Sequence, residues 1–296
     1  MQLTRHADAN ATLCALIQPL ATRPGFVDTN LAQVQVLSWG HYVASSPQIY
    51  EPSLMILAQG SKVARLGPRT LEYGAGHYLV QALSVPFMCE TFATEDEPLL
   101  GVSVAIDRTV LGELVQSMGL GAGQAAAQTP ESMTSAALDA PMRESVERLL
   151  RCLQDPLESR VMGAARVREV LYVALRGPQA GVLRALVEQQ GHFARIAASL
   201  SHLREHYAEP LSVEALAGRA NMSSSTFHEH FKRCTLLSPI QYLKRLRLLK
   251  AQQMLIGEGL GVAQVAHRVG YQSTSQFSRE YKRHFERSPG QEHSYL

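Results

Sequence analysis

Apolar residues in the first third of the chain fall in short runs separated by glycine and proline. The runs cover residues 34–39, 53–58, 62–66, 70–73, 77–82, 87–92 and 100–106, with Gly60, Gly67-Pro68, Gly74, Gly76 and Pro86 between them. Short strands between such turns predict an antiparallel sandwich or barrel rather than alternating βαβ units. A short helix is expected before them, over residues 10–20.

The apolar spacing becomes helical after Ile106. Asp107 is placed to cap a helix, and further helices are predicted over 141–153 and 160–175. The stretch 119–137 is rich in Gly, Ala, Gln and Ser and is expected to be a mobile loop. The helices of 141–175 would either cover the barrel or form a dimer interface, and the sequence favours neither.

A helix-turn-helix is predicted over residues 211–234. Ser212 caps a short helix with Leu216 and Ala217 inward, and a tight turn follows at 220–222. Ser223 then caps a second helix whose inner face carries Phe227 and Phe231 at i, i+4.

The same plan recurs at 262–285. Gly270 makes the turn, Ser273 caps the second helix, and Phe277, Tyr281 and Phe285 recur at steps of four. A helix over 239–256 joins the two units. One unit alone would be a weak signal, because short amphipathic helices are common. Two copies that share a cap-x₃-Phe-x₃-aromatic pattern are far more specific.

The net charge of +2 hides two opposite contributions. Residues 1–190 contain 14 Lys and Arg against 18 Asp and Glu, whereas residues 191–296 contain 14 against 8. The front of the chain is therefore mildly acidic and the back carries a net +6, which points to a polyanionic partner for the back. A hydrophobic fraction of 46% over 296 residues excludes global disorder and suggests two domains.

The four cysteines, Cys14, Cys89, Cys152 and Cys234, show no C-x-x-C spacing. A disulfide framework or zinc site is therefore not expected, although redox sensing by one thiol stays open. No signal peptide and no membrane-spanning apolar run is evident, so a cytoplasmic protein without membrane contact is expected.

Residues 195–290 resemble the DNA-binding domain of the AraC/XylS family of bacterial transcription regulators. The resemblance is carried by Leu216-Ala217, Met222-Ser223, Phe231-Lys232, Tyr242-Leu243, Arg247, Ala251, Val265-Ala266, Val269-Gly270-Tyr271, Phe277-Ser278-Arg279, Phe285 and Ser288-Pro289. The chain departs from the family at Leu236-Leu237, where members usually have a glycine after the first recognition helix. The geometry of that turn is therefore an open point.

The front of the chain resembles the cupin-like N-terminal domain of a subset of these regulators. The matching residues are Tyr50-Glu51-Pro52-Ser53, Gln59-Gly60-Ser61-Lys62, Leu66-Gly67 and Tyr73 with Gly76-His77-Tyr78-Leu79-Val80. The expected fold class is α+β. A cupin-like jelly-roll barrel with flanking helices would occupy residues 1–180, and an all-α domain of two helix-turn-helix units would occupy 190–296.

The second helix of each unit is expected to enter the major groove of double-stranded DNA. The outward residues predicted to contact bases are Ser225, His228 and Glu229 in the first unit and Thr274, Ser275, Gln276, Ser278 and Arg279 in the second. Arg279 suits guanine, Gln276 suits adenine and Glu229 suits the cytosine amino group. The alternative for each is a solvated helix face, and for Ser225 and Thr274 it is a helix cap.

Basic residues that follow these positions are expected to hold phosphates. They are Lys232, Lys282 and Arg283. Arg247, on the connecting helix, could either contact the DNA backbone or pack the two units together.

A barrel joined to a DNA reader suggests a sensor. Trp39, Tyr50, Tyr78 and Phe87 are candidates to line an effector pocket, with ordinary barrel core as the alternative for each. A cupin-type metalloenzyme is the rival class, but residues 31–106 contain only His41 and His77, far apart, so no catalytic residue, metal or cofactor is expected.

The resemblance implies a homodimeric activator that binds a specific DNA sequence and responds to an effector. As an activator it would contact RNA polymerase. Repression stays open, as does a front domain that only dimerises.

Overall fold

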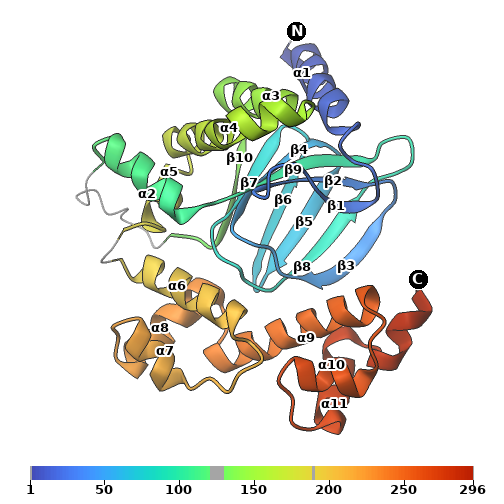
Figure 1. Ribbon diagram of the computed structural model, residues 1–296, viewed down its shortest axis with the longest axis vertical. Helices are drawn as coiled ribbons and strands as arrows, with labels where there is room; N and C mark the ends of the chain where they lie inside the picture. The colour runs from blue at the N-terminus through green and yellow to red at the C-terminus, as the bar shows by residue number, and fades with distance from the viewer. Residues whose placement is uncertain (1, 121–129, 189–190, 296) are drawn as a thin grey trace. The chain divides into compact units, whose positions relative to one another are not determined.

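The computed structural model describes residues 2–120, 130–188 and 191–295. The chain forms two compact units. The first comprises Met1–Ser46, Tyr50–Leu83 and Met88–Ala194, and the second comprises Arg195–Leu296 with the short segments Pro47–Ile49 and Ser84–Phe87. Strands and flanking helices build the first unit, whereas the second is helical (Figure 1). This confirms the predicted α+β class.

The strands of the first unit form two sheets. In the described part of the chain, one sheet has the order β1-β2-β9-β4-β7-β10 and the other has the order β3-β8-β5-β6. Every strand pair whose register the structure gives is antiparallel. The strands are β1 (Gly25–Asp28), β2 (Val34–Trp39), β3 (Val43–Gln48), β4 (Ser53–Gln59), β5 (Ser61–Leu66), β6 (Arg69–Gly74), β7 (His77–Gln81), β8 (Phe87–Phe92), β9 (Leu99–Ala105) and β10 (Met133–Ala137).

The central strands β4 and β9 are buried along almost their whole length. Helix α1 (Gln2–Ile17) contacts both of them and packs against α3 (Ala140–Leu153), which in turn packs against α4 (Pro156–Arg176) (Figure 1). One face of these strands therefore meets the helices while the other faces the second sheet. A strand covered on both faces reads as a continuous apolar run, as residues 53–58 do.

The prediction of a loop over residues 119–137 is wrong at the C-terminal end of this range. Residues 121–129 lie outside the described part of the chain, but Met133–Ala137 form β10, which pairs with β7 from Met133 opposite Gln81 to Ala137 opposite His77. The segment has weak strand character on its own. Its hydrogen-bonding partner comes from a strand about 50 residues earlier, so only the tertiary fold supplies the pairing.

Two further strands, β1 and β3, were not predicted from the apolar pattern. Strand β3 has the sequence VASSPQ and lies at the end of its sheet. A polar strand that contains proline is tolerated at a sheet edge, where one side needs no ladder partner. Strand β1 is only four residues long and also lies at an edge.

The first helix after the two sheets begins at the predicted cap, whereas α4 begins at Pro156, four residues before the expected start. Helix α2 (Arg108–Ser117) begins after Asp107, whose carboxylate accepts from the backbone N–H groups of Thr109 and Val110. Asp155 caps α4 in the same way after ending α3. Helix α3 buries its apolar stripe, as a covering helix does, whereas α4 leaves Leu157 and Val161 64% and 69% exposed. A short helix α5 (Ala180–Ala185) follows.

The second unit contains the two predicted helix-turn-helix segments. Its elements are α6 (His192–Glu205), α7 (Val213–Arg219), α8 (Ser224–Thr235), α9 (Pro239–Gly257), α10 (Val262–Arg268), α11 (Thr274–Phe285) and the 3₁₀ helix η1 (Pro289–Tyr295). Helix α9 joins α8 to α10, and its buried residues Leu248, Ala251 and Leu255 enter the core of the second segment (Figure 1).

Candidate nucleic-acid interface

In the first helix-turn-helix, hydroxyl caps start both helices. Ser212 accepts a hydrogen bond from the Ala215 N–H (3.0 Å), and Ser223 accepts one from the Thr226 N–H (3.2 Å). Such caps satisfy backbone donors that have no partner within the helix. Between the helices the chain turns at Asn221, which has φ 51°.

The inner face of α8 fixes its orientation. Phe227 and Phe231 are fully buried, and the Phe231 ring lies 5.6 Å from the ring of Tyr242 on α9 in an edge-to-face arrangement. Because one face of α8 is anchored in this way, the opposite face is available to a partner. Ser225, His228 and Glu229 are exposed on it, as is Lys232 in the last turn.

Some of these outward groups already have local partners. The hydroxyl of Ser225 lies 3.1 Å from that of Ser223, and the carboxylate of Glu229 lies 3.7 Å from the guanidinium of Arg233. Ser223 is the cap, so the alternative role of Ser225 as a cap is not the one the structure shows. An exposed i, i+4 pair such as Glu229–Arg233 is weak and can be exchanged for another partner.

Leu236 takes the conformation that a glycine would have taken. It ends α8 with φ 59° and donates its N–H to the Lys232 carbonyl (2.8 Å). The adjacent Thr235 hydroxyl accepts from the Leu237 N–H (3.2 Å) and donates to the Phe231 carbonyl (2.8 Å). Helix α8 therefore ends in a left-handed residue even without a glycine, although a left-handed non-glycine residue costs roughly 1 kcal/mol.

The second helix-turn-helix turns at Gly270. Its φ is +89°, and a Cβ at this position would lie 2.4 Å from the carbonyl oxygen of Ala208. Helix α11 then begins after Ser273, which accepts from the Gln276 N–H (3.3 Å). Phe277 and Tyr281 are fully buried on its inner face.

The outer face of α11 presents the predicted reading residues. Thr274, Ser275, Gln276 and Arg279 are exposed, and Ser278 is half-buried. Thr274 is the first residue of the helix and Ser273 is its cap, so the alternative role of Thr274 as a cap does not apply. Of these side chains, Gln276 is tied to a neighbour within the unit.

The Glu280 carboxylate lies behind this face and is the acceptor for three side-chain donors. It accepts from Gln276 Nε2 (3.2 Å), Lys244 Nζ (3.1 Å) and the Tyr271 hydroxyl (2.9 Å). Burial alone would raise the pKa of Glu280, but these three hydrogen bonds outweigh it and the pKa is lowered. The carboxylate therefore stays ionised, and it orients the Gln276 amide before any partner arrives.

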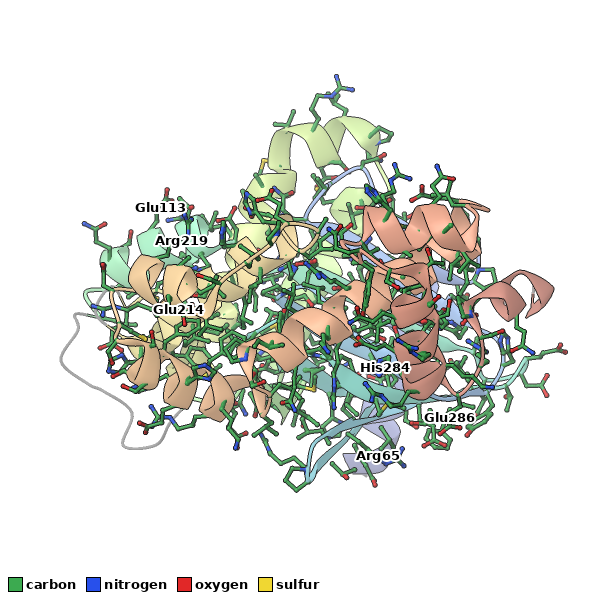
Figure 2. The ribbon with its side chains drawn as sticks, turned by 90° about the horizontal axis from the view of Figure 1, so that it is seen from below. Arg65, Glu113, Glu214, Arg219, His284 and Glu286 are labelled. Carbon is green, nitrogen blue, oxygen red and sulfur yellow. The ribbon has the colours of Figure 1, made fainter. Side chains whose placement is uncertain are left out.

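Basic side chains gather toward the end of α11. Lys282 and Arg283 are exposed. Burial and the charge of Arg245 lower the pKa of His284 to about 4, so this imidazole adds no positive charge near neutral pH. In Figure 2, Glu214 and Arg219 lie on α7, while His284 and Glu286 lie at the C-terminal end of α11.

Arg247 is engaged inside the second unit. Its Nε donates to the Tyr207 carbonyl (2.7 Å), and its terminal nitrogens donate to the carbonyls of Gly270 (3.1 Å) and Glu209 (3.0 Å). These bonds tie α9 to the segment after α6 and to the turn of the second helix-turn-helix. Of the two predicted roles for Arg247, packing is the one this geometry favours.

The candidate effector residues do not form one group. Trp39 and Tyr50 both pack edge-to-face on Phe26, with ring centroids 5.5 Å apart in each pair. The Tyr78 hydroxyl instead lies beside Gly177, at the end of α4, so Tyr78 points to the helical layer and not between the sheets. Phe87 is buried at the first residue of β8.

Sequence reasoning missed two acidic residues that organise the second helix-turn-helix. Glu280 lies four residues after Gln276, a spacing that could have suggested their pairing. Glu292 is 1% exposed and accepts from the Tyr281 hydroxyl (2.7 Å) and Arg287 Nε (2.8 Å). No local pattern marks Glu292, because its partners come from the end of α11 and the segment that follows it.

The cysteines carry buried or partly buried free thiols. Burial raises the pKa of Cys14, Cys89, Cys152 and Cys234. A raised pKa reduces the thiolate fraction, which disfavours the redox-sensing alternative. Within residues 2–120, 130–188 and 191–295, no three His, Cys, Asp or Glu side chains converge as a candidate metal site. In the same residues, no helix has the length and apolar character needed to cross a bilayer.

Two family models match the chain. Residues 30–182 match the N-terminus of AraC-type transcriptional regulators, and residues 216–293 match a helix-turn-helix domain. The HTH-type transcriptional activator RhaS of Salmonella schwarzengrund is 31% identical over 149 residues, which cover 49% of this chain and 52% of RhaS. RhaS of Citrobacter koseri is 36% identical over 96 residues, covering 32% of this chain and 34% of RhaS. The chain thus spans about half the length of these relatives, or less.

A solved structure shares the fold over most of the chain. Apo ToxT from Vibrio cholerae, in a variant form, superposes with a TM-score of 0.57 at 8% identity, covering 89% of this chain and 98% of ToxT. At this identity the likeness concerns the fold alone. The N-terminal family model covers more than half of the chain and the helix-turn-helix model covers most of the remainder. The chain belongs to the AraC-type family of transcriptional regulators.

Proposed function

We propose that this chain binds specific double-stranded DNA sequences and activates transcription from them in response to a small molecule. The observation that carries the proposal is the pair of helix-turn-helix segments in one helical unit. The second helix of each segment is anchored by two buried aromatic rings and exposes polar side chains on the opposite face. That combination suits sequence-specific reading of a major groove.

The outward-facing residues have distinct proposed roles. Arg279 reads guanine and Gln276 reads adenine, while Thr274, Ser275 and Ser278 make further base contacts from α11. On α8, Ser225, His228 and Glu229 contact bases, and Lys232 binds a phosphate. Lys282 and Arg283 bind phosphates beside the second groove.

The recognition helices α8 and α11 belong to two segments joined by α9, and they should occupy successive major grooves. Their centres would then lie about one helical turn, or ~34 Å, apart along the DNA. A single copy should accordingly protect about two turns of duplex. Because α8 and α11 present different side chains, the two halves of the site should differ in sequence.

Selection from a random DNA library tests the proposal. The full chain is incubated with random duplexes at ~150 mM salt, and bound fragments are sequenced over several rounds. We expect enrichment of one asymmetric site with two conserved segments about 10 base pairs apart. Equal retention of all sequences would contradict the proposal, because phosphate contacts alone give no sequence preference.

Activation and an effector are the finer parts of the proposal. RhaS is named as a transcriptional activator, and another ToxT structure is described as bound to an unsaturated fatty acid (TM-score 0.53, 10% identity, 86% of this chain and 92% of ToxT). An activator would contact RNA polymerase as a second partner. Purified polymerase and a template carrying the selected site should give more transcript with the chain than without it.

We also propose a homodimer through α4. Leu157 and Val161 lie four residues apart and project large apolar side chains into solvent, with Met162 and Tyr172 also exposed on the same helix. An exposed apolar patch of this kind marks an interaction surface. Val161→Asp should shift the molecular mass measured by sedimentation equilibrium from dimer to monomer. Arg160→Asp, one residue away, is the control and should leave the mass unchanged.

A further inference from the structure

A lysine lies inside the first unit and forms no ion pair with any carboxylate among the described residues. Lys62, the second residue of β5, is 2% exposed. Along this strand Lys62, Ala64 and Leu66 are buried, whereas Arg65 is exposed, so Lys62 points inward between the sheets. Buried lysines nearly always have a partner, since removing an ammonium from water is costly.

The partners that the structure gives Lys62 are aromatic rings. Its Nζ lies 4.3 Å from the centroid of the Trp39 ring and 5.9 Å from that of Tyr50. Phe26 packs edge-to-face on both of these rings. Among the described residues, no carboxylate pairs with this ammonium. Cation–π contacts favour the charged form, but they offset only part of the cost of burying it.

The neighbouring ionisable groups cannot supply the missing negative charge near neutral pH. Burial raises the pKa of Cys89, and the nearby charge of Lys62 lowers it only in part, so this group stays a thiol. Burial also raises the pKa of Tyr50 and of Tyr73 well above the usual range, so both phenols stay protonated. Burial lowers the pKa of Lys62 itself, and the Coulombic influence of Cys89 offsets this only in part.

We propose that Lys62 binds the carboxylate of a small-molecule acid whose apolar or aromatic body packs against Phe26, Trp39 and Tyr50. A single ammonium suits a single negative charge. The surrounding rings suit an apolar body that the sheets can shield from water. This inference rests on the proposed effector response and names the chemical class of the effector.

Trp39 provides a built-in reporter, because it is the chain's single tryptophan. The full-length protein is titrated with benzoate, phenylacetate and octanoate and with the matching neutral amides, and Trp39 emission and melting temperature are recorded. We expect at least one acid to change the emission saturably and raise the melting temperature, and its amide to bind at least tenfold more weakly. A ligand specific for the folded state must raise its stability.

Two variants locate the effect. Lys62→Met should weaken binding of that acid at least tenfold, whereas Arg65→Met should not. Arg65, labelled in Figure 2, lies on the same strand. Its side chain is 45% exposed. If no acid changes Trp39 emission at 10 mM, roughly a thousandfold excess over protein, or if amides bind as well as acids, the proposal is overturned and Lys62 is a structural cation held by Trp39. The acid–amide comparison needs only the wild-type protein, so it stands even if Lys62→Met misfolds.

The same samples are assayed for binding to the selected DNA site. Loss of the acid response with sequence-specific DNA binding intact overturns only the effector assignment. Absence of any preferred DNA sequence overturns the proposed function, while Trp39 emission still reports whether the acid binds.

Discussion

The first helix-turn-helix turns at Asn221, which has φ 51°, whereas the second turns at Gly270, which has φ 89°. Asparagine tolerates the left-handed region, and nothing forces the first turn to lack a side chain. At Gly270 the backbone of Ala208 leaves no room for a Cβ. The residue type at the first turn thus follows from the conformational preference of asparagine itself. At the second turn the nearby backbone of Ala208 requires glycine.

The same contrast extends to the recognition helices. Helix α8 is held by its serine cap, by its aromatic pair, which packs on Tyr242 of α9, and by the Thr235 hydroxyl at its end. Helix α11 has the same kind of serine cap and aromatic pair, and it is also tied to α9 through Glu280 and to the C-terminal segment through Glu292. The second reader is therefore more preorganised, and the first can adjust more to its DNA.

Gly270→Ala should produce the largest effect. The new methyl group would meet the Ala208 carbonyl, and the left-handed backbone would be strained. We expect a loss of about 3 kcal/mol in the free energy of unfolding, measured by urea denaturation. Asn221→Gly is the matched change in the first unit and should shift stability by less than about 1 kcal/mol. Equal losses in the free energy of unfolding for the two variants would contradict the proposed difference between the two turns.

Arg247→Met should come next. It leaves the carbonyls of Tyr207, Glu209 and Gly270 without their donor, so we expect a loss of about 2–3 kcal/mol in stability. Arg245→Met removes an exposed charge from the same helix and should change stability by less than about 0.5 kcal/mol. An Arg247→Met protein of normal stability, with a weaker dependence of DNA affinity on salt, would instead assign Arg247 to the DNA backbone.

Arg279→Ala and Lys232→Ala compare the two proposed kinds of DNA contact. Arg279→Ala should cost about 1–3 kcal/mol on the selected site and relax the preference at one base pair. Lys232→Ala should weaken binding to all sequences alike and reduce the slope of log affinity against log salt by about 1. The measurement is fluorescence anisotropy on single-base variants of the site at several salt concentrations. The reverse pattern would exchange the two roles.

The smallest effect is expected from Leu236→Gly, and it should be stabilising. Glycine removes the strain at φ 59°, and the leucine is 40% exposed, so little apolar burial is lost. We expect a gain of about 0.5–1 kcal/mol by urea denaturation. Glu286→Gly, at φ 63° in the second unit, is the matched variant. A loss of stability for Leu236→Gly would mean that the leucine side chain contributes packing that its exposure does not reveal.

Much of the fold and of the recognition faces could be predicted from local patterns. Ser223 and Ser273 cap their helices as expected, and Phe227, Phe231, Phe277 and Tyr281 lie on the inner faces. These features depend on spacings of three or four residues, so the sequence contains all the information they need. The proposed DNA contacts follow by elimination, because they occupy the face that the aromatic residues leave free.

The sites that depend on distant segments could not be predicted. Met133–Ala137 forms a strand because its backbone pairs with that of β7. Tyr78 points to the helical layer, although its position in the strand allowed either face. In each case the deciding partner is set by how the chain folds back on itself, not by the neighbouring sequence.

By itself, the sequence determined the family, the two-part organisation and which helix faces are apolar or polar, since hydrophobic periodicity and capping are local properties. The tertiary structure alone decided that Arg247 is held by three backbone carbonyls and that the buried Lys62 ammonium lies against the ring of Trp39. Burial and pairing of a charge depend on segments brought together from across the fold. Two basic residues therefore have different roles. Arg247 connects segments of the second unit, and Lys62 of the first unit is a proposed ligand contact.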